Sequence, residues 1–440
     1  MGADGVDGSG PLAVIAVIGA GYVGLTTAAC LAELGHRVIC TDVDGTRIAA
    51  LQRGEVPIRE PGLAGLVQSG LDADRLSFVL GSAEAAARAD FVYLCVPTPS
   101  NSQGGTDLSY LEAAASEIGP NLKPGAVVVN KSTAPAGTAA MLHRVLGRAD
   151  VAVASNPEFL RQGSAVSDFL NPARVVVGAD DASVAERVAG LFAGLDEPML
   201  ITDLASAETT KYAANAFLAM KLSFTNSVAA LCEAVGADVN DVLAGMGYDP
   251  RIGREYLRPG PGWGGSCLPK DTRALVAAAA EAGYDYRLLR SVVAANDEQF
   301  DRIVDKVARR VRIDGARIAL FGLAFKAGTD DTRDSPALEI ARRLTAAGAA
   351  VRAFDPAVSA SPAAEAAGIS ITGDAYTACD QASALVVATE WDEFRRLDFA
   401  RIAGVMAQRH VVDARNMLDR AALERLGFTY SGLGLRGDND

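Results

Sequence analysis

A single thiol, Cys267, lies in a glycine-dense segment whose residue types could carry out nucleophilic chemistry. The segment reads Gly260-Pro-Gly-Trp-Gly-Gly-Ser-Cys-Leu-Pro-Lys-Asp271, so an ammonium and a carboxylate follow the thiol by three and four residues. Glycines let a backbone approach a ligand closely, and a helix predicted to begin near Asp271 would favour a thiolate at its positive end. The pattern indicates a nucleophilic cysteine with a carboxylate that could position water. A buried structural cysteine beside a helix cap fits the same residues.

A second segment has the order of features that a dinucleotide site requires. An apolar, β-branched run at residues 13–18 predicts a buried parallel strand, and it leads through a glycine-rich turn into a helix over residues 25–34. A second strand over residues 37–41 ends at an acid, Asp42. The glycines would admit a pyrophosphate to the helix N-terminus. The candidate residues of the turn are Gly19, Gly21, Tyr22, Val23 and Gly24.

The acid at the second strand end bears on which dinucleotide would bind. A carboxylate at Asp42 would accept hydrogen bonds from ribose hydroxyls and repel a 2′-phosphate, which favours NAD over NADP. The alternative is a plain βαβ unit that binds nothing.

Further strands in the first half end in residues that could contact a ligand, because open α/β sheets bind ligands at their strand ends. A strand over residues 91–96 precedes Thr98, and one over 126–130 precedes Ser132 and Thr133. These hydroxyl residues could equally form turns. A strand over 151–155 leads into Asn156-Pro-Glu-Phe-Leu-Arg-Gln-Gly163, where a carboxylate, an aromatic ring and an arginine indicate a site. A solvated Glu–Arg turn is the competing interpretation.

A long helical tract without proline or glycine separates the two halves of the chain. It begins at Asp203 or Ser206 and ends at Gly236, which suits a spine between domains and an interface in a homodimer. Lys211 and Asn215 lie four residues apart and therefore project from one face. Lys211 lies among small apolar residues and would need an anionic neighbour there, unless it extends along a solvated face.

The second half repeats the strand–loop–helix outline without the glycine motif. Strands are predicted over residues 317–325, 350–354, 384–388 and 410–413. The strand ends carry Lys326, Arg333 and Arg415, and arginine forks match phosphate oxygens. The pattern indicates a second Rossmann-like sheet that binds a nucleotide or diphosphate through cations.

Composition narrows the class of protein. The 440 residues favour two or three domains, and the net charge of −13 argues against a nucleic-acid partner. Six widely spaced cysteines without a CxxC pair, together with no signal peptide, indicate a reducing, cytoplasmic compartment. We expect no membrane span and, with three scattered histidines, no metal site.

The chain resembles the UDP-glucose/GDP-mannose dehydrogenase family, and within it the UDP-glucose branch. The likeness runs from Val14 to about Leu418 and includes six motifs in order. These are Gly19-x-Gly21-x-x-Gly24, Lys131-Ser-Thr133, Asn156-Pro-Glu-Phe-Leu160, Lys211-x-x-x-Asn215, Gly264-Gly-Ser-Cys-Leu-Pro-Lys-Asp271 and Phe325-Lys-x-Gly-Thr-Asp-Asp-Thr-Arg333.

The resemblance implies an α/β fold of two Rossmann-like doubly wound domains joined by a long central helix. We expect a disordered tail (1–11), an NAD-binding domain (12–203), a central dimerisation domain with the cysteine loop (204–312) and a UDP-sugar-binding domain (313–440). It also implies that a nucleotide sugar such as UDP-glucose is oxidised twice at C6 by NAD through a thiohemiacetal and a thioester on Cys267.

The resemblance further implies roles for individual residues. The catalytic set is Cys267, Lys211, Asn215, Asp271, Glu158 and Thr133. Besides the glycine turn, the cofactor would contact Asp42, Arg47, Thr98, Ser132, Thr133, Gln162, Cys267, Lys270 and Arg333. The nucleotide sugar would contact Glu158, Phe159, Leu160, Arg161, Lys211, Asn215, Arg251, Tyr256, Leu257, Gly264, Phe325, Lys326 and Arg415. Arg251 and Arg333 would reach the neighbouring subunit's site.

Two residues depart from the family pattern, and several alternatives stay open. Gln162 stands where a glutamate is common, and Trp263 where tyrosine or phenylalanine is usual. Thr133, Glu158 or Asp271 could be the principal base. GDP-mannose or a UDP-N-acetylhexosamine is an alternative substrate, and a non-catalytic nucleotide-sugar sensor is an alternative from another class.

Overall fold

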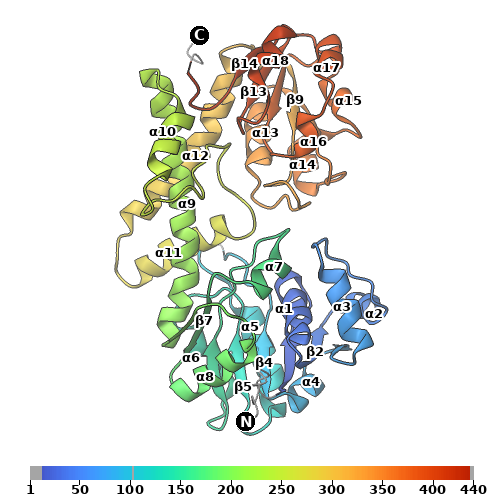
Figure 1. Ribbon diagram of the computed structural model, residues 1–440, viewed down its shortest axis with the longest axis vertical. Coiled ribbons are helices and arrows are strands. Elements are labelled where there is room, and N and C mark those ends of the chain that lie inside the picture. The colour runs from blue at the N-terminus through green and yellow to red at the C-terminus, as the bar shows by residue number, and fades with distance from the viewer. Residues whose placement is uncertain (1–11, 102–103, 437–440) are drawn as a thin grey trace, which may run out of the picture. The chain divides into compact units, whose positions relative to one another are not determined.

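The computed structural model describes residues 12–101 and 104–436, and the tail predicted to be disordered (1–11) lies outside them. The chain forms two compact units, Met1–Ala214 and Asn215–Asp440. The boundary between them falls within one long helix. Each unit contains one sheet with helices packed on it (Figure 1). The α/β class and the two Rossmann-like sheets predicted from the sequence are confirmed. The predicted four-part division of the chain stays a prediction.

The sheet of the first unit has eight strands and places the dinucleotide motif at its centre. Its order is β3 (Leu76–Leu80), β2 (Arg37–Asp42), β1 (Val14–Ile18), β4 (Phe91–Leu94), β5 (Val127–Asn130), β6 (Ala152–Ser155), β7 (Val175–Ala179) and β8 (Met199–Thr202). All neighbours are parallel except β6 and β7. The strand order reverses at β1, which pairs with β2 on one side and β4 on the other. Such a switch point is where open α/β sheets bind ligands.

The helices of the first unit cover this sheet and bury its apolar strands. They are α1 (Tyr22–Glu33), α2 (Gly45–Gln52), α3 (Leu63–Asp72), α4 (Ala83–Arg88), α5 (Ser109–Ile118), α6 (Thr138–Leu146), α7 (Ala165–Leu170) and α8 (Ala182–Ala189), with short 3-10 turns at Gly119–Asn121 and Gly190–Phe192. Helix α1 begins three residues before the predicted start at Leu25, because Gly21 is its N-cap and Tyr22 to Gly24 form the first turn.

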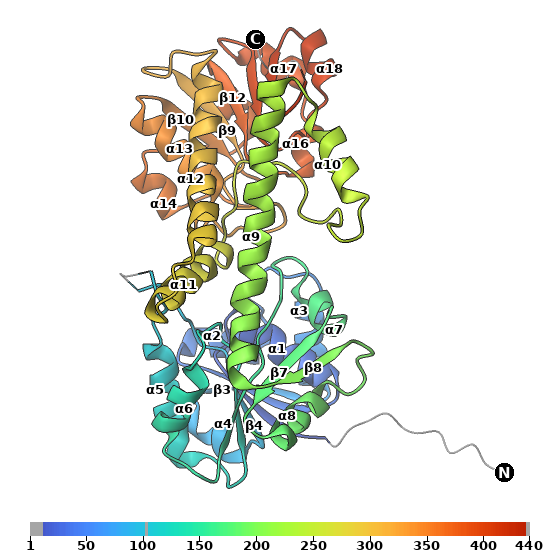
Figure 2. The ribbon, with the colours of Figure 1, turned by 90° about the vertical axis from the view of Figure 1, so that its left-hand side faces the viewer.

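The predicted long helix is confirmed as α9 (Leu204–Val235), which has 32 residues and runs without a break in Figure 2. Of its two candidate caps, Asp203 is the acceptor: its carboxylate accepts hydrogen bonds from the backbone N–H and the hydroxyl of Ser206, at 2.8 and 2.7 Å. Alanines and small polar residues dominate the tract, and without a proline or glycine nothing interrupts it.

The second unit contains an all-parallel sheet of six strands. Its order is β11 (Ser370–Ile371), β10 (Ala350–Phe354), β9 (Arg317–Phe321), β12 (Ala384–Val387), β13 (His410–Asp413) and β14 (Thr429–Ser431). Its helices are α10 (Val239–Gly247), α11 (Leu268–Glu281), α12 (Arg287–Ala308), α13 (Pro336–Ala346), α14 (Pro362–Ala366), α15 (Ala375–Cys379), α16 (Asp392–Arg395), α17 (Phe399–Val405) and α18 (Arg420–Arg425).

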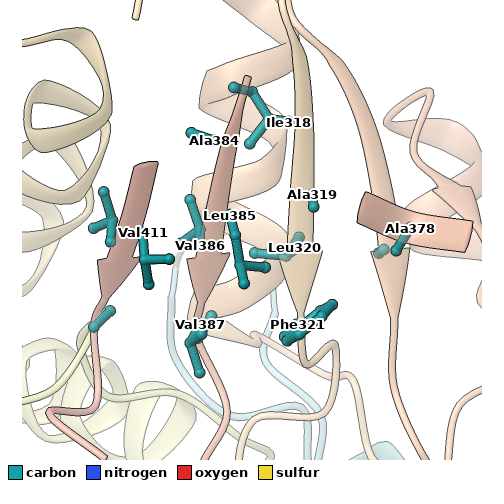
Figure 3. Close-up of a cluster of buried hydrophobic side chains, with 14 of the residues drawn as sticks. Ile318, Ala319, Leu320, Phe321, Ala378, Ala384, Leu385, Val386, Val387 and Val411 are labelled. Carbon is teal, nitrogen blue, oxygen red and sulfur yellow. The ribbon is translucent and has the colours of Figure 1, made fainter. Parts of the chain in front are cut away.

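The core of the second unit forms where side chains of neighbouring strands meet (Figure 3). Leu320, Leu385 and Val411 are fully or almost fully buried there, together with Phe321. Strand β9 ends at Phe321, four residues before the predicted end, because Gly322 takes a φ of +98° and the next two N–H groups bond to Asp355. The apolar run continues past the strand but belongs to the loop.

Among the helices of the described residues, none has the length and hydropathy that crossing a membrane requires.

Candidate active site

The glycines of the first turn are required by close backbone contacts. A Cβ on Gly24 would lie 1.8 Å from the carbonyl oxygen of Gly19, and one on Gly19 would lie 2.5 Å from that of Cys95. Gly21 has open space around it and caps α1. Strand β1 thus meets the N-terminus of α1 in a tight turn with room beside it, which fits the pyrophosphate of a dinucleotide.

Asp42 ends β2 next to this turn, and its carboxylate is held from three sides. It accepts hydrogen bonds from the N–H groups of Ala20 (2.8 Å) and Asp44 (2.9 Å), and Arg47 lies 2.9 Å away. Burial alone would raise the pKa of Asp42, but these hydrogen bonds and the guanidinium more than offset it, so the pKa is lowered. An ionised acid at this position fits a cofactor with a free ribose 2′-hydroxyl.

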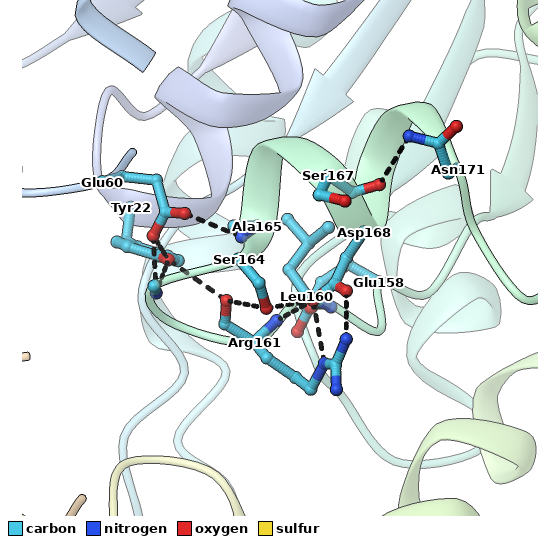
Figure 4. A network of polar contacts seen from close by, with 11 residues as sticks. Tyr22, Glu60, Glu158, Leu160, Arg161, Ser164, Ala165, Ser167, Asp168 and Asn171 are labelled. Atoms are coloured by element: carbon cyan, nitrogen blue, oxygen red, sulfur yellow. Dashed lines mark hydrogen bonds and ion pairs between the residues drawn. The ribbon is translucent and has the colours of Figure 1, made fainter. Parts of the chain in front are cut away.

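Tyr22, in the glycine turn, connects the turn to the segment that carries Glu158 (Figure 4). Its hydroxyl bonds to the buried carboxylate of Glu60, which also accepts the N–H groups of Gly163 (2.7 Å) and Ala165 (2.8 Å). Glu60 therefore holds two loops against each other. Glu60 could not be predicted as a site residue, since Tyr22 lies 38 residues from it along the chain and Gly163 and Ala165 lie 103 and 105 residues from it.

Glu158 and Lys211 form a buried ion pair at the end of β6. The Lys211 Nζ lies 2.9 Å from Glu158 Oε1, and Glu158 Oε2 accepts the N–H of Leu160 at 2.7 Å. Burial opposes ionisation of Glu158, but the charge of Lys211 and these hydrogen bonds outweigh it and lower its pKa. The anionic neighbour that the sequence required for Lys211 is thus present. The alternative of a lysine on a solvated face is wrong, since Lys211 is 4% exposed.

Arg161 does not pair with Glu158, so the competing interpretation of a solvated Glu–Arg turn is also wrong. Its guanidinium pairs with Asp168 at 2.6 Å, as Figure 4 shows. The ring of Phe159 instead faces Lys211 and stacks under Arg174, whose guanidinium carbon lies 3.4 Å from the ring centroid. Asp168 and Arg174 were not predicted as site residues.

Three predicted hydroxyl residues, Thr98, Ser132 and Thr133, follow strands β4 and β5. Ser132 uses its hydroxyl to donate to the carbonyls of Leu94 and Val96, so it supports the loop. Thr133 is half-buried and Thr98 is buried, both in loops that follow these strands.

In the second unit, the thiol lies at the start of a helix. Cys267 is the N-cap of α11, so the helix begins three residues before the predicted position and its positive end faces the cysteine. The buried Asp271 carboxylate accepts a hydrogen bond from Asn215 at 2.6 Å, and the Nζ of Lys270 lies 2.8 Å from its other oxygen. The other five cysteines are buried, whereas Cys267 is partly exposed.

Buried polar side chains of α9 and α12 hold the glycine loop before the thiol. Asn296 bonds to both backbone groups of Trp263, at 2.8 and 3.0 Å. The Trp263 indole N–H donates to Ser223 at 2.8 Å, a bond that phenylalanine could not make. Gly264 approaches the carbonyl of Asp334 so closely that a Cβ there would lie 2.0 Å from it.

Two of the three cations predicted at the second sheet, Arg333 and Arg415, lie in ion pairs, as does Arg251. Arg333 pairs with Asp331 (2.6 Å), and its pKa is raised chiefly by this hydrogen bond, with a smaller contribution from Cys267. Arg415 lies 2.8 Å from Glu390, and Arg251 lies 2.6 Å from Asp249 on an exposed loop. Of the remaining predicted contacts, Leu257 and Gly264 are buried, Phe325, Lys326 and Gln162 are partly exposed, and Tyr256 has a φ of +61°.

These features define a dehydrogenase class: a dinucleotide turn at the switch point of one sheet, a lysine paired with a carboxylate, and a thiol at a helix N-terminus. Models of the UDP-glucose/GDP-mannose dehydrogenase family match the chain in three successive parts. The NAD binding domain matches residues 13–196, the central domain residues 205–298 and the UDP binding domain residues 319–420. The chain belongs to this family and is an NAD-dependent oxidoreductase.

Individual relatives are similar over almost their whole length. A UDP-glucose 6-dehydrogenase of Pseudomonas aeruginosa is 44% identical over 96% of this chain and 97% of its own length. A UDP-glucose 6-dehydrogenase of Rhizobium meliloti is 44% identical over 96% of this chain and 99% of its own length. Among solved structures, a UDP-glucose dehydrogenase of Pyrobaculum islandicum has a TM-score of 0.86 at 37% identity and covers 93% of this chain and 96% of its own. A UDP-D-ManNAc dehydrogenase of Pyrococcus horikoshii has a TM-score of 0.86 at 28% identity, and the match covers 96% of this chain and 99% of its own.

Proposed function

We propose that the chain is a UDP-glucose 6-dehydrogenase that oxidises C6 of UDP-glucose twice, to UDP-glucuronate. The observation that carries the proposal is the 44% identity, over 96% of the chain, to proteins of that name. It is supported by a partly exposed thiol, Cys267, at a helix N-terminus and by Lys211 beside an ionised Glu158. NAD, when bound, accepts the two electrons and one hydrogen nucleus that leave C6 in each oxidation.

In the first oxidation the chain's residues handle the proton and the charge on oxygen. The C6 hydroxyl loses its proton to a base, and its carbon loses a hydride, which gives an aldehyde. Glu158 is ionised, as its lowered pKa indicates, and can accept a proton directly or through water. Lys211 and Asn215 lie one turn apart on α9 and can both donate to the oxygen of C6. Thr133 and Asp271 remain candidates for holding the water.

In the second oxidation the thiol makes and breaks one covalent bond. The Cys267 thiolate adds to the aldehyde carbon to give a thiohemiacetal, whose carbon loses a second hydride to give a thioester. Water then attacks the thioester carbon, the C–S bond breaks, and the carboxylate and thiol are released. Glu158 or Asp271 can activate this water. Two hydrides leave C6 in total, which requires two NAD molecules.

The binding residues implied by the resemblance belong to this proposal. For NAD these are Gly19, Gly21, Tyr22, Val23, Gly24, Asp42, Arg47, Thr98, Ser132, Thr133, Gln162, Cys267, Lys270 and Arg333. For the nucleotide sugar they are Glu158, Phe159, Leu160, Arg161, Lys211, Asn215, Arg251, Tyr256, Leu257, Gly264, Phe325, Lys326 and Arg415. The ion pairs of Arg161, Arg251, Arg333 and Arg415 would have to rearrange or be shared when a ligand binds.

The identity of the sugar is tested by comparing substrates. UDP-glucose, GDP-mannose, UDP-N-acetylglucosamine and UDP-N-acetylmannosamine are each incubated with the purified protein and NAD while NADH absorbance is followed. We expect UDP-glucose to give a kcat/KM at least a hundredfold above the others. The UDP-N-acetylhexosamines deserve inclusion because a UDP-D-ManNAc dehydrogenase shares the fold. A larger kcat/KM with another nucleotide sugar would reassign the substrate within the family.

A non-catalytic nucleotide-sugar sensor is disfavoured because binding alone needs no thiol at a helix N-terminus. The same assay decides it, since a sensor would bind UDP-glucose and form no NADH.

We also propose that the protein is a homodimer through α9. Phe217, Phe224 and Leu231 lie seven residues apart and thus on one face of this helix, and Val235 follows one turn later. Each is more than half exposed. A stripe of this spacing can pack against the same stripe of a second copy.

A further inference from the structure

Lys131 is a buried ammonium for which the proposed mechanism has no role. It follows the last residue of β5 and is 4% exposed. Its Nζ donates to the side-chain oxygen of Asn156 at 3.0 Å and to its carbonyl at 3.5 Å, and these are its hydrogen-bond acceptors among the residues that the structure describes. The rings of Tyr93 and Phe169 face the ammonium, with centroids 5.9 and 5.7 Å away.

Asn156 is held so that its amide oxygen must face this cation. Its backbone N–H donates to the carbonyl of Asn130 at 2.9 Å, which continues the pairing of β6 with β5. Its side-chain NH₂ donates to the carbonyl of Val176 at 2.8 Å, which fixes which end of the amide is the oxygen. Two residues further along the chain is Glu158, so Lys131 supports the turn that presents this carboxylate.

The charges around Lys131 do not cancel. Lys131, Lys211 and Glu158 are each at most 7% exposed, and together they give one excess positive charge. The other titratable groups that face Lys131 are the thiols of Cys30 and Cys95 and the phenol of Tyr93. Burial raises the pKa of the Tyr93 phenol, so it is neutral near pH 7. Burial raises the pKa of each thiol to about 12, so both are neutral near pH 7. A buried cluster with excess positive charge is suited to stabilise an anion that forms beside it.

We propose that Lys131 is a positioning residue that holds Glu158 in its ionised form and gives the cluster its excess positive charge, which stabilises the oxyanion on C6 of the sugar. The proposal rests on the proposed function for its reaction, but the coupling between Lys131 and Glu158 is a property of the protein alone.

The titration of Lys131 provides a test that needs no substrate. Burial lowers the pKa of Lys131 to about 8; the charge of Lys211 acts in the same direction, and the carboxylate of Glu158 acts in the opposite direction. A lysine in the unfolded chain has a pKa of about 10.4. Between these values the unfolded chain binds more protons, so the contribution of Lys131 to stability rises with pH from about 8 to about 10.

Thermal unfolding of four proteins measures the coupling: wild type, Lys131→Met, Glu158→Gln and the double variant, between pH 6 and 10. We expect the Tm of wild type to rise relative to Lys131→Met above pH 8. In the Glu158→Gln background this rise should begin at lower pH, because the ammonium has lost its carboxylate. Lys123→Met, which removes a surface lysine paired with Asp90, should show neither effect. Effects that add at every pH would overturn the proposal.

Kinetics with NAD and UDP-glucose test the consequence for the reaction. Lys131→Met should lower kcat about tenfold with a nearly unchanged KM for UDP-glucose. The acid limb of the pH profile of kcat should move to higher pH in this variant, because Glu158 is protonated more easily. Asn156→Asp, which adds a negative charge at nearly constant volume, should lower kcat as well. A wild-type kcat and pH profile in Lys131→Met would contradict the proposal. If wild type itself forms no NADH from UDP-glucose, the proposed function fails, and the unfolding cycle still decides whether Lys131 and Glu158 are coupled.

Discussion

Two successive turns of α9 each present one side chain to a buried carboxylate. Lys211 pairs with Glu158, and Asn215 donates to Asp271. An ammonium and an amide are both donors, so each is suited to an oxygen that gains negative charge during reaction. The carboxylates keep these donors oriented, and in the proposed mechanism a substrate oxygen replaces them as a partner.

The proposed covalent step requires sulfur at position 267. In Cys267→Ser the alcohol is a far weaker nucleophile than a thiolate. We expect NADH formation with UDP-glucose to fall by at least a thousandfold, while the affinity for UDP-glucose, measured by calorimetry, changes less than threefold. Ser266→Ala, which changes the neighbouring hydroxyl, is the matched control and should retain most activity. A Cys267→Ser protein with near wild-type turnover would refute the thiohemiacetal route.

In the proposed function, Asp42 sets the preference for NAD over NADP. Asp42→Ala removes the carboxylate that would repel a 2′-phosphate, and it leaves Arg47 with Asp44, 3.9 Å away, in place of the closer partner at 2.9 Å. We expect kcat/KM for NAD to fall about tenfold and the preference for NAD over NADP to fall at least as much. Comparing both cofactors at saturating UDP-glucose measures this ratio. Asp44→Ala, a nearby acid that caps α2, should leave the ratio unchanged. If Asp42→Ala keeps the wild-type preference for NAD over NADP, Asp42 does not determine that preference.

At the residue scale, composition around a side chain predicted some partners and missed others. Lys211 lies among alanines, so an anionic neighbour was foreseeable, and Glu158 fills that place. Glu60 was not foreseeable, because its role comes from Tyr22, Gly163 and Ala165, which only the folded chain brings to it. The same holds for Asp168, which pairs with Arg161.

At the scale of elements, the loop before α11 determines where the thiol lies. Its glycines are held between the side chains of α9 and α12 and the backbone near Asp334. Long helices thus fix a loop that has little regular structure of its own.

Gly264→Ala tests the need for this close approach. A Cβ at this position would lie 2.0 Å from the carbonyl oxygen of Asp334 and 2.6 Å from Pro336, so the loop must move. We expect kcat to fall at least tenfold and the Tm to drop by several degrees. Activity and thermal unfolding are measured in parallel with Gly245→Ala, an exposed helical glycine with open space around it. If Gly264→Ala behaves like that control, the loop does not constrain the thiol.

Sequence periodicity predicted whole elements better than their ends. The 32 residues of α9 contain no helix breaker, and strands β10 and β13 have the bounds that their apolar runs predicted. The predicted starts of α1 and α11 were three residues late, since Gly21 and Cys267 act as N-caps without a capping side chain. Strands β7 and β8 were missed, and the antiparallel pairing of β6 with β7 has no signal in the chain.

At the scale of the whole molecule, the exposed stripe on α9 predicts the oligomeric state. Phe224→Asp with Leu231→Asp places two charges on each copy of the proposed interface. We expect wild type to sediment as a dimer and the double variant as a monomer at micromolar concentration. Tyr284→Asp with Leu288→Asp, which changes two exposed apolar residues outside α9, is the control and should stay dimeric. A dimeric Phe224→Asp, Leu231→Asp protein would place the interface elsewhere.

The count of electrons removed from one sugar tests the account most directly. Purified protein is given a limiting, known amount of UDP-glucose with excess NAD, NADH is measured at completion, and the product is identified by mass. We predict two NADH per UDP-glucose and UDP-glucuronate as the only product, because the aldehyde is held on Cys267 until it is oxidised again. One NADH per UDP-glucose with a released aldehyde would contradict the account.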